Sequence, residues 1–273
     1  MMHYLTDPFH YAFIQRAALA GMLIGVLCAC WGSFVVLRRM SLIGHALSHS
    51  ALPGLVIAFL FGWNLLFGAF AAILVTAMLI GVLSRDNTIN EDTSGGIIPN
   101  VMFALGILLI STTKSFRDLF SMLFGNILAV SAMDLTCIVL ITIVALAVLF
   151  LLYKELKLFC VDPQYARAIG IPVDRLRYTI LIFLALTVVV GIQAVGTVLT
   201  NALLVIPVAA ARILTDRLSV MMILSSVFAV IAALGGVYAS YYFGFSSGAA
   251  IVMVCAIIFG IAWVYQFIRR SVK

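Results

Sequence analysis

Two histidines, His45 and His49, lie four residues apart within an apolar stretch of the sequence. On a helix, residues with this spacing share one face and lie about one turn apart. Imidazole is a frequent ligand of transition metals, and polar side chains at membrane depth are costly and typical of ion pathways. The pair therefore indicates a site that a metal ion visits during transport, with His49 and His45 as its ligands.

Pro53 and Gly54 follow the pair closely. Proline has no N–H, so it cannot donate to the carbonyl of His49 four residues earlier. Backbone that is freed in this way is tolerated in a membrane only where it is buried in protein or lines a wet cavity. We therefore expect the helix to be broken near Pro53.

Two imidazoles are too few to close a metal site. A symmetric dimer could bring four of them together on its axis. Four nitrogens would suit zinc, iron(II), nickel or copper better than magnesium or calcium. The alternative is that both histidines only form hydrogen bonds between packed helices. The chain's other two histidines, His3 and His10, are near the N-terminus and are not expected to be ligands.

Composition places the chain in a membrane. Of its 273 residues, 65% are hydrophobic and 10% are charged, whereas about 25% are charged in a soluble domain. We expect an all-α polytopic membrane protein with eight or nine transmembrane helices, forming one transmembrane domain over residues 1–273. The expected spans are 12–37, 42–62, 65–84, 97–112, 134–153, 179–199, 218–241 and 248–268, with 202–214 as a short ninth that is tilted or broken near Pro207. In the first span, small residues recur every fourth position and predict close helix packing: Ala17, Gly21, Gly25 and Ala29.

The basic residues predict the orientation. The net charge is +6, which in a membrane protein reflects basic cytoplasmic loops rather than binding to nucleic acid. If the N-terminus is outside and all nine segments cross, the C-terminus is cytoplasmic. Of the sixteen Lys and Arg residues, only Arg16, Lys114 and Arg117 then fall outside.

The longest polar connection on the expected cytoplasmic side contains a short predicted helix at 162–171. Asp162 is a good N-cap, Pro163 fits the first helical position, and Gly170 fits the position just after the C-cap. We expect Tyr165, Ala166 and Ile169 on one side of this helix and Arg167 on another. Such a helix either docks into another protein or lies on the membrane surface. The sequence has no G-x-x-x-x-G-K-[ST] pattern, so ATP-driven transport would need a partner ATPase.

Several motifs together resemble the permeases of manganese/zinc/iron ABC importers. The run Leu37 to Gly54 resembles the second-helix signature of that family. Further pieces follow in the same order along nearly the whole chain: Leu123 to Ser131, Asp162 to Pro172, Gly196 to Leu199 with Leu204 to Arg212, and Ser247 to Ala249.

The resemblance implies a multi-pass permease of the bacterial plasma (inner) membrane, not an enzyme itself. Its expected partners are ATP-binding subunits on the cytoplasmic side, a second permease copy or a sister permease, an extracytoplasmic metal-binding protein, and membrane lipid. It implies no permanently bound cofactor: the transported divalent metal is manganese, zinc or iron, and ATP is used by the partner. His49 matches the family histidine, whereas His45 stands where the family usually has aspartate. The segment from Asp162 to Gly170, including Pro163, Tyr165, Ala166, Arg167 and Ile169, matches the part that couples to the ATPase.

Two other functions remain open at this point. A permease for a metal chelate or another small solute would have a wider cavity, with the histidines incidental to transport. An intramembrane hydrolase could use Ser48 with a histidine, but Ser48 and His49 are adjacent on a helix and their side chains diverge by about 100°.

Overall fold

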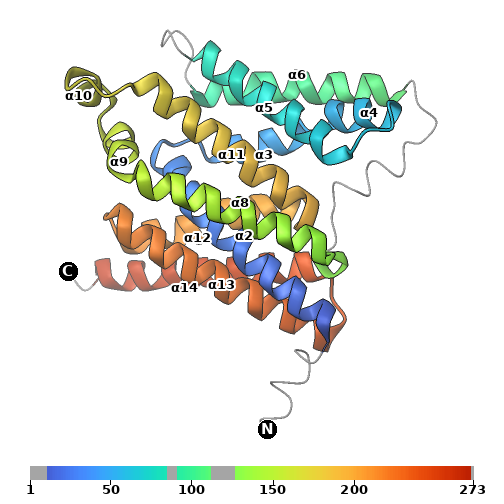
Figure 1. The fold of residues 1–273 in the computed structure, drawn as a ribbon. Coiled ribbons are helices and arrows are strands. Elements are labelled where there is room, and N and C mark those ends of the chain that lie inside the picture. The colour runs from blue at the N-terminus through green and yellow to red at the C-terminus, as the bar shows by residue number, and fades with distance from the viewer. Residues whose placement is uncertain (1–10, 85–90, 112–126, 272–273) are drawn as a thin grey trace. The chain divides into compact units, whose positions relative to one another are not determined.

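The computed structural model describes residues 11–84, 91–111 and 127–271, and every regular element in these ranges is a helix (Figure 1). Nine helical stretches among the described residues are long and apolar enough to cross a membrane. This confirms the expected all-α polytopic fold. The elements are α2 (Ala12–Leu37), α3 (Ser41–His49), α4 (Leu52–Leu60), α5 (Leu65–Leu83), α6 (Glu91–Ser111), the 3-10 helix η2 (Ile127–Ala129), α8 (Ala132–Leu151), α9 (Tyr153–Val161), α10 (Pro163–Ala168), α11 (Val173–Val195), α12 (Thr197–Leu214), α13 (Leu218–Phe243) and α14 (Ser247–Ser271).

The chain divides into two compact units. One comprises residues 1–33, 125–146 and 194–273, and the other comprises residues 34–124 and 147–193. The histidine pair and the predicted cytoplasmic helix both belong to the second unit. The single permease domain expected over residues 1–273 stays a prediction, since each unit is described by itself.

Several boundaries in the C-terminal half differ from the prediction, including the start of the expected span 179–199, which lies at Val173. The expected span 179–199 ends earlier, at Val195, because Gly196 turns the chain with a φ of 87°. The expected short segment 202–214 is therefore the longer helix α12, which begins at Thr197. It also runs through Pro207 without the expected break, and Pro207 itself is buried.

The entry to the histidine helix is a tight turn. At the end of α2, the Met40 N–H donates to the Val35 carbonyl and the Arg39 N–H donates to the Val36 carbonyl. These two bonds form a Schellman motif around Arg39, whose φ is 60°. The left-handed region costs a residue with a side chain about 1–2 kcal/mol. The turn leads directly into α3, which begins at Ser41.

The predicted break near Pro53 is a short interruption. Helix α3 ends at His49 and α4 begins at Leu52, with Pro53 in the first turn of α4. The two residues between them keep right-handed helical angles, with φ of −71° at Ser50 and −66° at Ala51. The proline thus separates two helical segments without unwinding the backbone at the histidines.

Backbones touch directly within the second unit. A Cβ added at Gly54 of α4 would clash with the Gly68 carbonyl of α5, and one at Gly68 would clash with the Gly54 carbonyl. On the other side, a Cβ at Gly106 of α6 would lie 2.9 Å from the Pro53 nitrogen. Helix α6 packs against α3, α4 and α5 (Figure 1). Glycine at these three positions thus lets α4, α5 and α6 pack closely together, next to the helix that carries the histidines.

The predicted small-residue row of the first span is also used in packing. A Cβ at Gly25 of α2 would lie 3.1 Å from Ala229 Cβ, and one at Gly21 would lie 3.3 Å from Ala233 Cβ. Both alanines are on α13, so small residues meet small residues along the α2–α13 contact. The prediction of close helix packing at this row is confirmed.

We expect Gly54→Ala to lower the stability of the protein by about 1–3 kcal/mol, because the new methyl group has no room between α4 and α5. Thermal unfolding of the purified protein in detergent measures the change.

The matched control is Gly96→Ala on α6, where an added Cβ meets nothing within 4 Å. Alanine there should leave stability unchanged or raise it by up to about 1 kcal/mol. Equal melting temperatures for the two variants would contradict the close approach of α4 and α5.

Candidate functional site

His45 and His49 point toward each other on α3. Their Nε2 atoms are 3.2 Å apart, and the two rings meet edge to face with centroids 4.6 Å apart. His45 is exposed and His49 is half-buried. At this distance one Nε2–H donates a hydrogen bond to the other Nε2. The predicted sharing of one helix face is therefore observed, and the two ring nitrogens converge on one small region.

This spacing suits a shared cation. Ring nitrogens bind zinc at about 2.0–2.1 Å, so two nitrogens 3.2 Å apart subtend about 100° at an ion held between them. That angle lies between the tetrahedral and the octahedral values. The pair could therefore supply two neighbouring ligand positions of a transition-metal ion without any rearrangement of the backbone.

The surroundings hold the pair in place. The ring of Phe103 on α6 packs against His49, with centroids 5.2 Å apart at 70°. Ser48, next to His49, is buried, and its hydroxyl donates to the Gly44 carbonyl at 3.0 Å. This is the usual bond of a helical serine, and the geometry offers no support for Ser48 as a nucleophile.

The pair is incomplete as a closed metal site. Among the residues that the structure describes, no three His, Cys, Asp or Glu side chains come together in a way that could hold a metal ion. His3 and His10 lie outside the described residues. Within the described part of one chain, a cation at the pair would thus have two protein ligands of this kind, with its other positions open to water or to groups from elsewhere.

The short helix in the long polar connection has the predicted ends. Asp162 is the N-cap of α10, and its Oδ1 accepts hydrogen bonds from the N–H groups of Gln164 and Tyr165 at 3.0 and 2.9 Å. Gly170 follows the C-cap with a φ of 86°. The N–H groups of Gly170 and Ile171 donate to the carbonyls of Arg167 and Ala166, which closes a second Schellman motif.

The faces of α10 differ from the prediction at one residue. Tyr165 and Ile169 are exposed, at 55% and 52%, as expected of a contact surface. Ala166 was expected on the same side but is fully buried. Ile169 is the C-cap, just beyond the end of the helix, so the exposed apolar patch consists of one side chain from α10 and one from its end.

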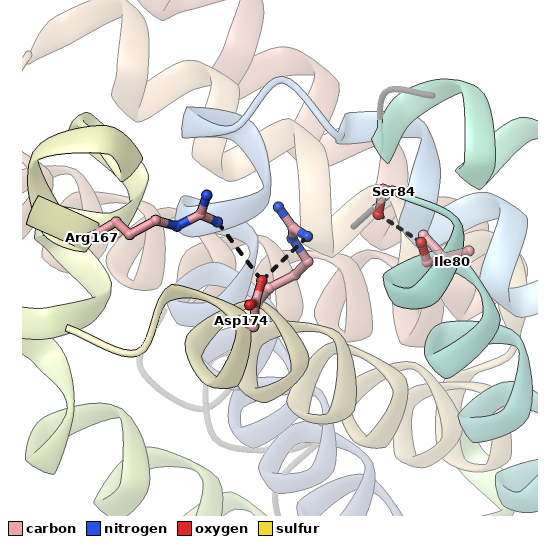
Figure 2. Close-up of polar contacts among 5 residues, drawn as sticks. Ile80, Ser84, Arg167 and Asp174 are labelled. Carbon is pink, nitrogen blue, oxygen red and sulfur yellow. Dashed lines mark hydrogen bonds and ion pairs between the residues drawn. The ribbon is translucent and has the colours of Figure 1, made fainter. Parts of the chain in front are cut away.

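Asp174 ties α10 to the start of α11. Its Oδ1 lies 3.9 Å from an Arg167 guanidinium nitrogen and 3.8 Å from one of Arg177. Figure 2 shows the Arg167 and Asp174 side chains reaching toward each other between the two helices. The same view shows Ser84, at the end of α5, whose hydroxyl donates to the Ile80 carbonyl at 2.6 Å. The exposed Arg167–Asp174 pair stabilises by at most about 1 kcal/mol, whereas the Arg177 side chain is buried.

A cation–π contact joins α9, which precedes α10, to the turn before the histidine helix. The Arg38 guanidinium carbon lies 4.2 Å from the centroid of the buried Phe159 ring. Arg38 is the C-cap of α2, three residues before α3 begins. The segment Tyr153–Ala168 is therefore connected through one side chain to the turn that sets the direction of the histidine helix.

Sequence reasoning missed Phe103, Phe159 and Asp174. Phe103 and Phe159 are ordinary apolar residues in apolar runs, and nothing in the sequence pairs them with His49 or Arg38. The ion pairs of Asp174 could have been predicted, because it is the one acidic residue between Arg167 and Arg177 in a polar connection.

The chain is similar to known transport proteins. Residues 10–266 match the family described as the ABC 3 transport family. The chain is 40% identical over 264 residues to the manganese transport system membrane protein MntC of Listeria monocytogenes, covering 97% of this chain and 94% of that one. It is 37% identical to the chelated iron transport system membrane protein YfeD of Yersinia pestis, with 97% and 89% covered.

A solved structure agrees in fold. PsaBC from Streptococcus pneumoniae, in complex with Fab, superposes with a TM-score of 0.83 at 34% identity and covers 96% of this chain and 95% of that one. The family match extends over almost the whole chain, and so the chain belongs to the ABC 3 transport family.

Proposed function

We propose that the chain is the membrane permease of an ATP-driven importer of divalent transition metal ions, and that the ion passes His45 and His49. The observation that carries this proposal is the pair of Nε2 atoms, 3.2 Å apart, on a membrane-spanning helix of an ABC 3 family member. A transport path must release its ion, and two ligands from one chain do not close a metal site by themselves.

The remaining ligands would come from a second permease. A dimer axis beside α3 would bring two such pairs together and so surround the ion with four imidazoles. Manganese, iron(II) and zinc all accept imidazole nitrogen. Relatives named for manganese and for chelated iron transport support this class of cargo.

ATP hydrolysis belongs to a partner subunit that docks on α10. Its exposed Tyr165 and Ile169 offer an apolar contact, and the capped ends of the helix make it rigid enough to transmit a push. The push reaches the histidines through α9 and the Arg38–Phe159 contact, because Arg38 precedes α3 directly. The proposed orientation places α10 and the C-terminus in the cytoplasm and the N-terminus outside. An extracytoplasmic binding protein delivers the ion to the outer side of the permease.

Replacing His49 with alanine should reduce metal uptake to background, because it removes one of the two converging nitrogens. Uptake of radioactive manganese or zinc into vesicles that contain the assembled importer measures this.

Ser50→Ala, at the C-cap of the histidine helix, is the matched control. Among the described hydrogen bonds, the Ser50 hydroxyl donates only to the Leu47 carbonyl, at 2.8 Å. Loss of this hydroxyl therefore leaves both imidazoles in place. Normal uptake by an assembled His49→Ala complex would refute the proposed ion path.

Position 45 should influence which metal is preferred. His45→Asp replaces a nitrogen ligand with a negatively charged oxygen, which favours manganese over zinc. We expect the ratio of manganese to zinc uptake to rise by about tenfold, equivalent to about 1.4 kcal/mol. Competition between manganese, zinc and iron(II) in reconstituted vesicles gives the ratio.

His45→Asn separates the ligand atom from its charge, since asparagine has the shape of aspartate without the negative charge. A selectivity that does not change in either variant would show that residue 45 does not touch the ion. Parallel uptake of the same metals as chelates distinguishes a path for free ions from the alternative of a chelate permease.

The docking role of α10 predicts that Tyr165→Ala with Ile169→Ala weakens binding of the ATP-binding subunit by about 2 kcal/mol or more, which is about thirtyfold. Co-purification of that subunit with the permease measures the loss.

Phe61→Ala with Trp63→Ala is the matched control. These two exposed rings stack in the connection between α4 and α5, which the proposed orientation places outside. Their removal should leave the ATP-binding subunit attached. Loss of the subunit from the control variant, or its retention by the α10 variant, would contradict docking at α10.

A further inference from the structure

A basic pocket lies in the first unit, at the C-terminal ends of α12 and α14. Its volume is about 540 Å³, and its polar lining consists of Arg212, Thr215, Asp216, Gln266, Arg269 and Arg270. Asp216 balances one positive charge, because its Oδ1 lies 3.1 Å from an Arg212 nitrogen. Three arginines against one carboxylate leave the pocket with a net charge of about +2, which is suited to a phosphate group.

An apolar groove of about 410 Å³ begins beside this pocket. It is lined by Leu214, Phe228, Ile231, Ile258, Ile261 and Tyr265. Leu214 lines both the pocket and the groove, and Tyr265 of the groove is adjacent to Gln266 of the pocket. The two hollows therefore form one surface, with a positively charged end and an apolar end.

Aromatic side chains indicate the depth of this surface in the membrane. Trp263 and Phe267 of α14 stack with centroids 6.1 Å apart, and both are exposed. Exposed Trp and Tyr residues near the end of a span are typical of the headgroup level of a bilayer. The arginines follow within two turns, so the pocket faces headgroups while the groove runs along the spans toward the acyl chains.

We propose that the pocket and the groove together bind one anionic phospholipid, with its phosphate against Arg212, Arg269 and Arg270 and one acyl chain in the groove. The proposal rests on charge complementarity and on the continuity of the two hollows. It is independent of metal transport. Basic pockets between transmembrane helices are a recurrent kind of site for acidic lipid headgroups. The lipid would join the ends of α12 and α14.

A protein partner is the competing explanation for the arginines. An ATP-binding subunit could contact them, but it would have no access to a groove that continues along α13 and α14 into the bilayer. The apolar end thus favours lipid, and the experiment below treats the protein contact as a result that overturns the proposal.

The test is native mass spectrometry of the full-length purified protein titrated with phosphatidylglycerol and, separately, with phosphatidylcholine of the same acyl chains. Each arginine near an anionic lipid contributes about fivefold in affinity, so Arg269→Gln with Arg270→Gln should weaken phosphatidylglycerol binding about 25-fold. Phosphatidylcholine binding should not change. The control Arg16→Gln with Arg175→Gln removes the same charge from two exposed arginines elsewhere and should bind phosphatidylglycerol normally.

A second variant tests the groove. Ile231→Trp fills it without touching the arginines and should also weaken phosphatidylglycerol binding. Millimolar inorganic phosphate should not displace the lipid. The proposal is overturned by unchanged phosphatidylglycerol binding in the pocket variant, by equal loss in the control, or by full displacement with phosphate. It is also overturned if the pocket variant keeps its lipid but loses the ATP-binding subunit on co-purification.

Discussion

Direct contact between helix backbones is the constraint on which the rest of the second unit depends. In a bilayer, lipid tails compete with apolar side chains for every helix surface, so helices associate through close packing rather than through the hydrophobic effect. At Gly54 and Gly68 the packing distance is set by carbonyl groups, which do not have rotamers. The positions of α4, α5 and α6 are therefore narrowly defined. Only two residues separate α3 from α4, so the narrowly defined position of α4 also limits the positions of the two imidazoles.

The proposed function places two different requirements on the second unit, one for the ion path and one for the coupling segment. An ion path needs ligands that hold briefly, and a coupling segment needs a rigid body that can be displaced. Under the proposed function, the exposed imidazole of His45 and the half-buried one of His49 would serve as these ligands. The double-capped α10, with Asp162 at one end and Gly170 at the other, would serve as the proposed coupling segment. Arg38 connects them, because its guanidinium lies over Phe159 while its backbone belongs to the turn before α3.

Much of the fold follows from the sequence because bilayer thickness sets the length of a span. The spans, the helix caps at Asp162 and Gly170, and the shared face of His45 and His49 depend on local spacing, so they were predictable. The unbroken helix at Pro207 was not predictable, because tertiary packing can hold a proline inside a helix, and Pro207 is buried. The burial of Ala166 could not be predicted either, because the side that a short helix buries depends on the elements packed against it. The contacts of Phe103 and Phe159 join residues that are far apart in the chain. A single sequence does not show which distant residues will contact each other.

The hydrogen bond between the two imidazoles has a consequence for the proposed uptake of an ion. In this hydrogen bond, one Nε2 bears the proton and the lone pair of the other Nε2 accepts the bond. A cation bound by both nitrogens needs a lone pair from each, so that proton must move to the other ring nitrogen or leave. While the two Nε2 atoms bond to each other, they do not offer two free lone pairs to an ion. Under the proposed function, loading would exchange this hydrogen bond for a metal bond, and unloading would restore it.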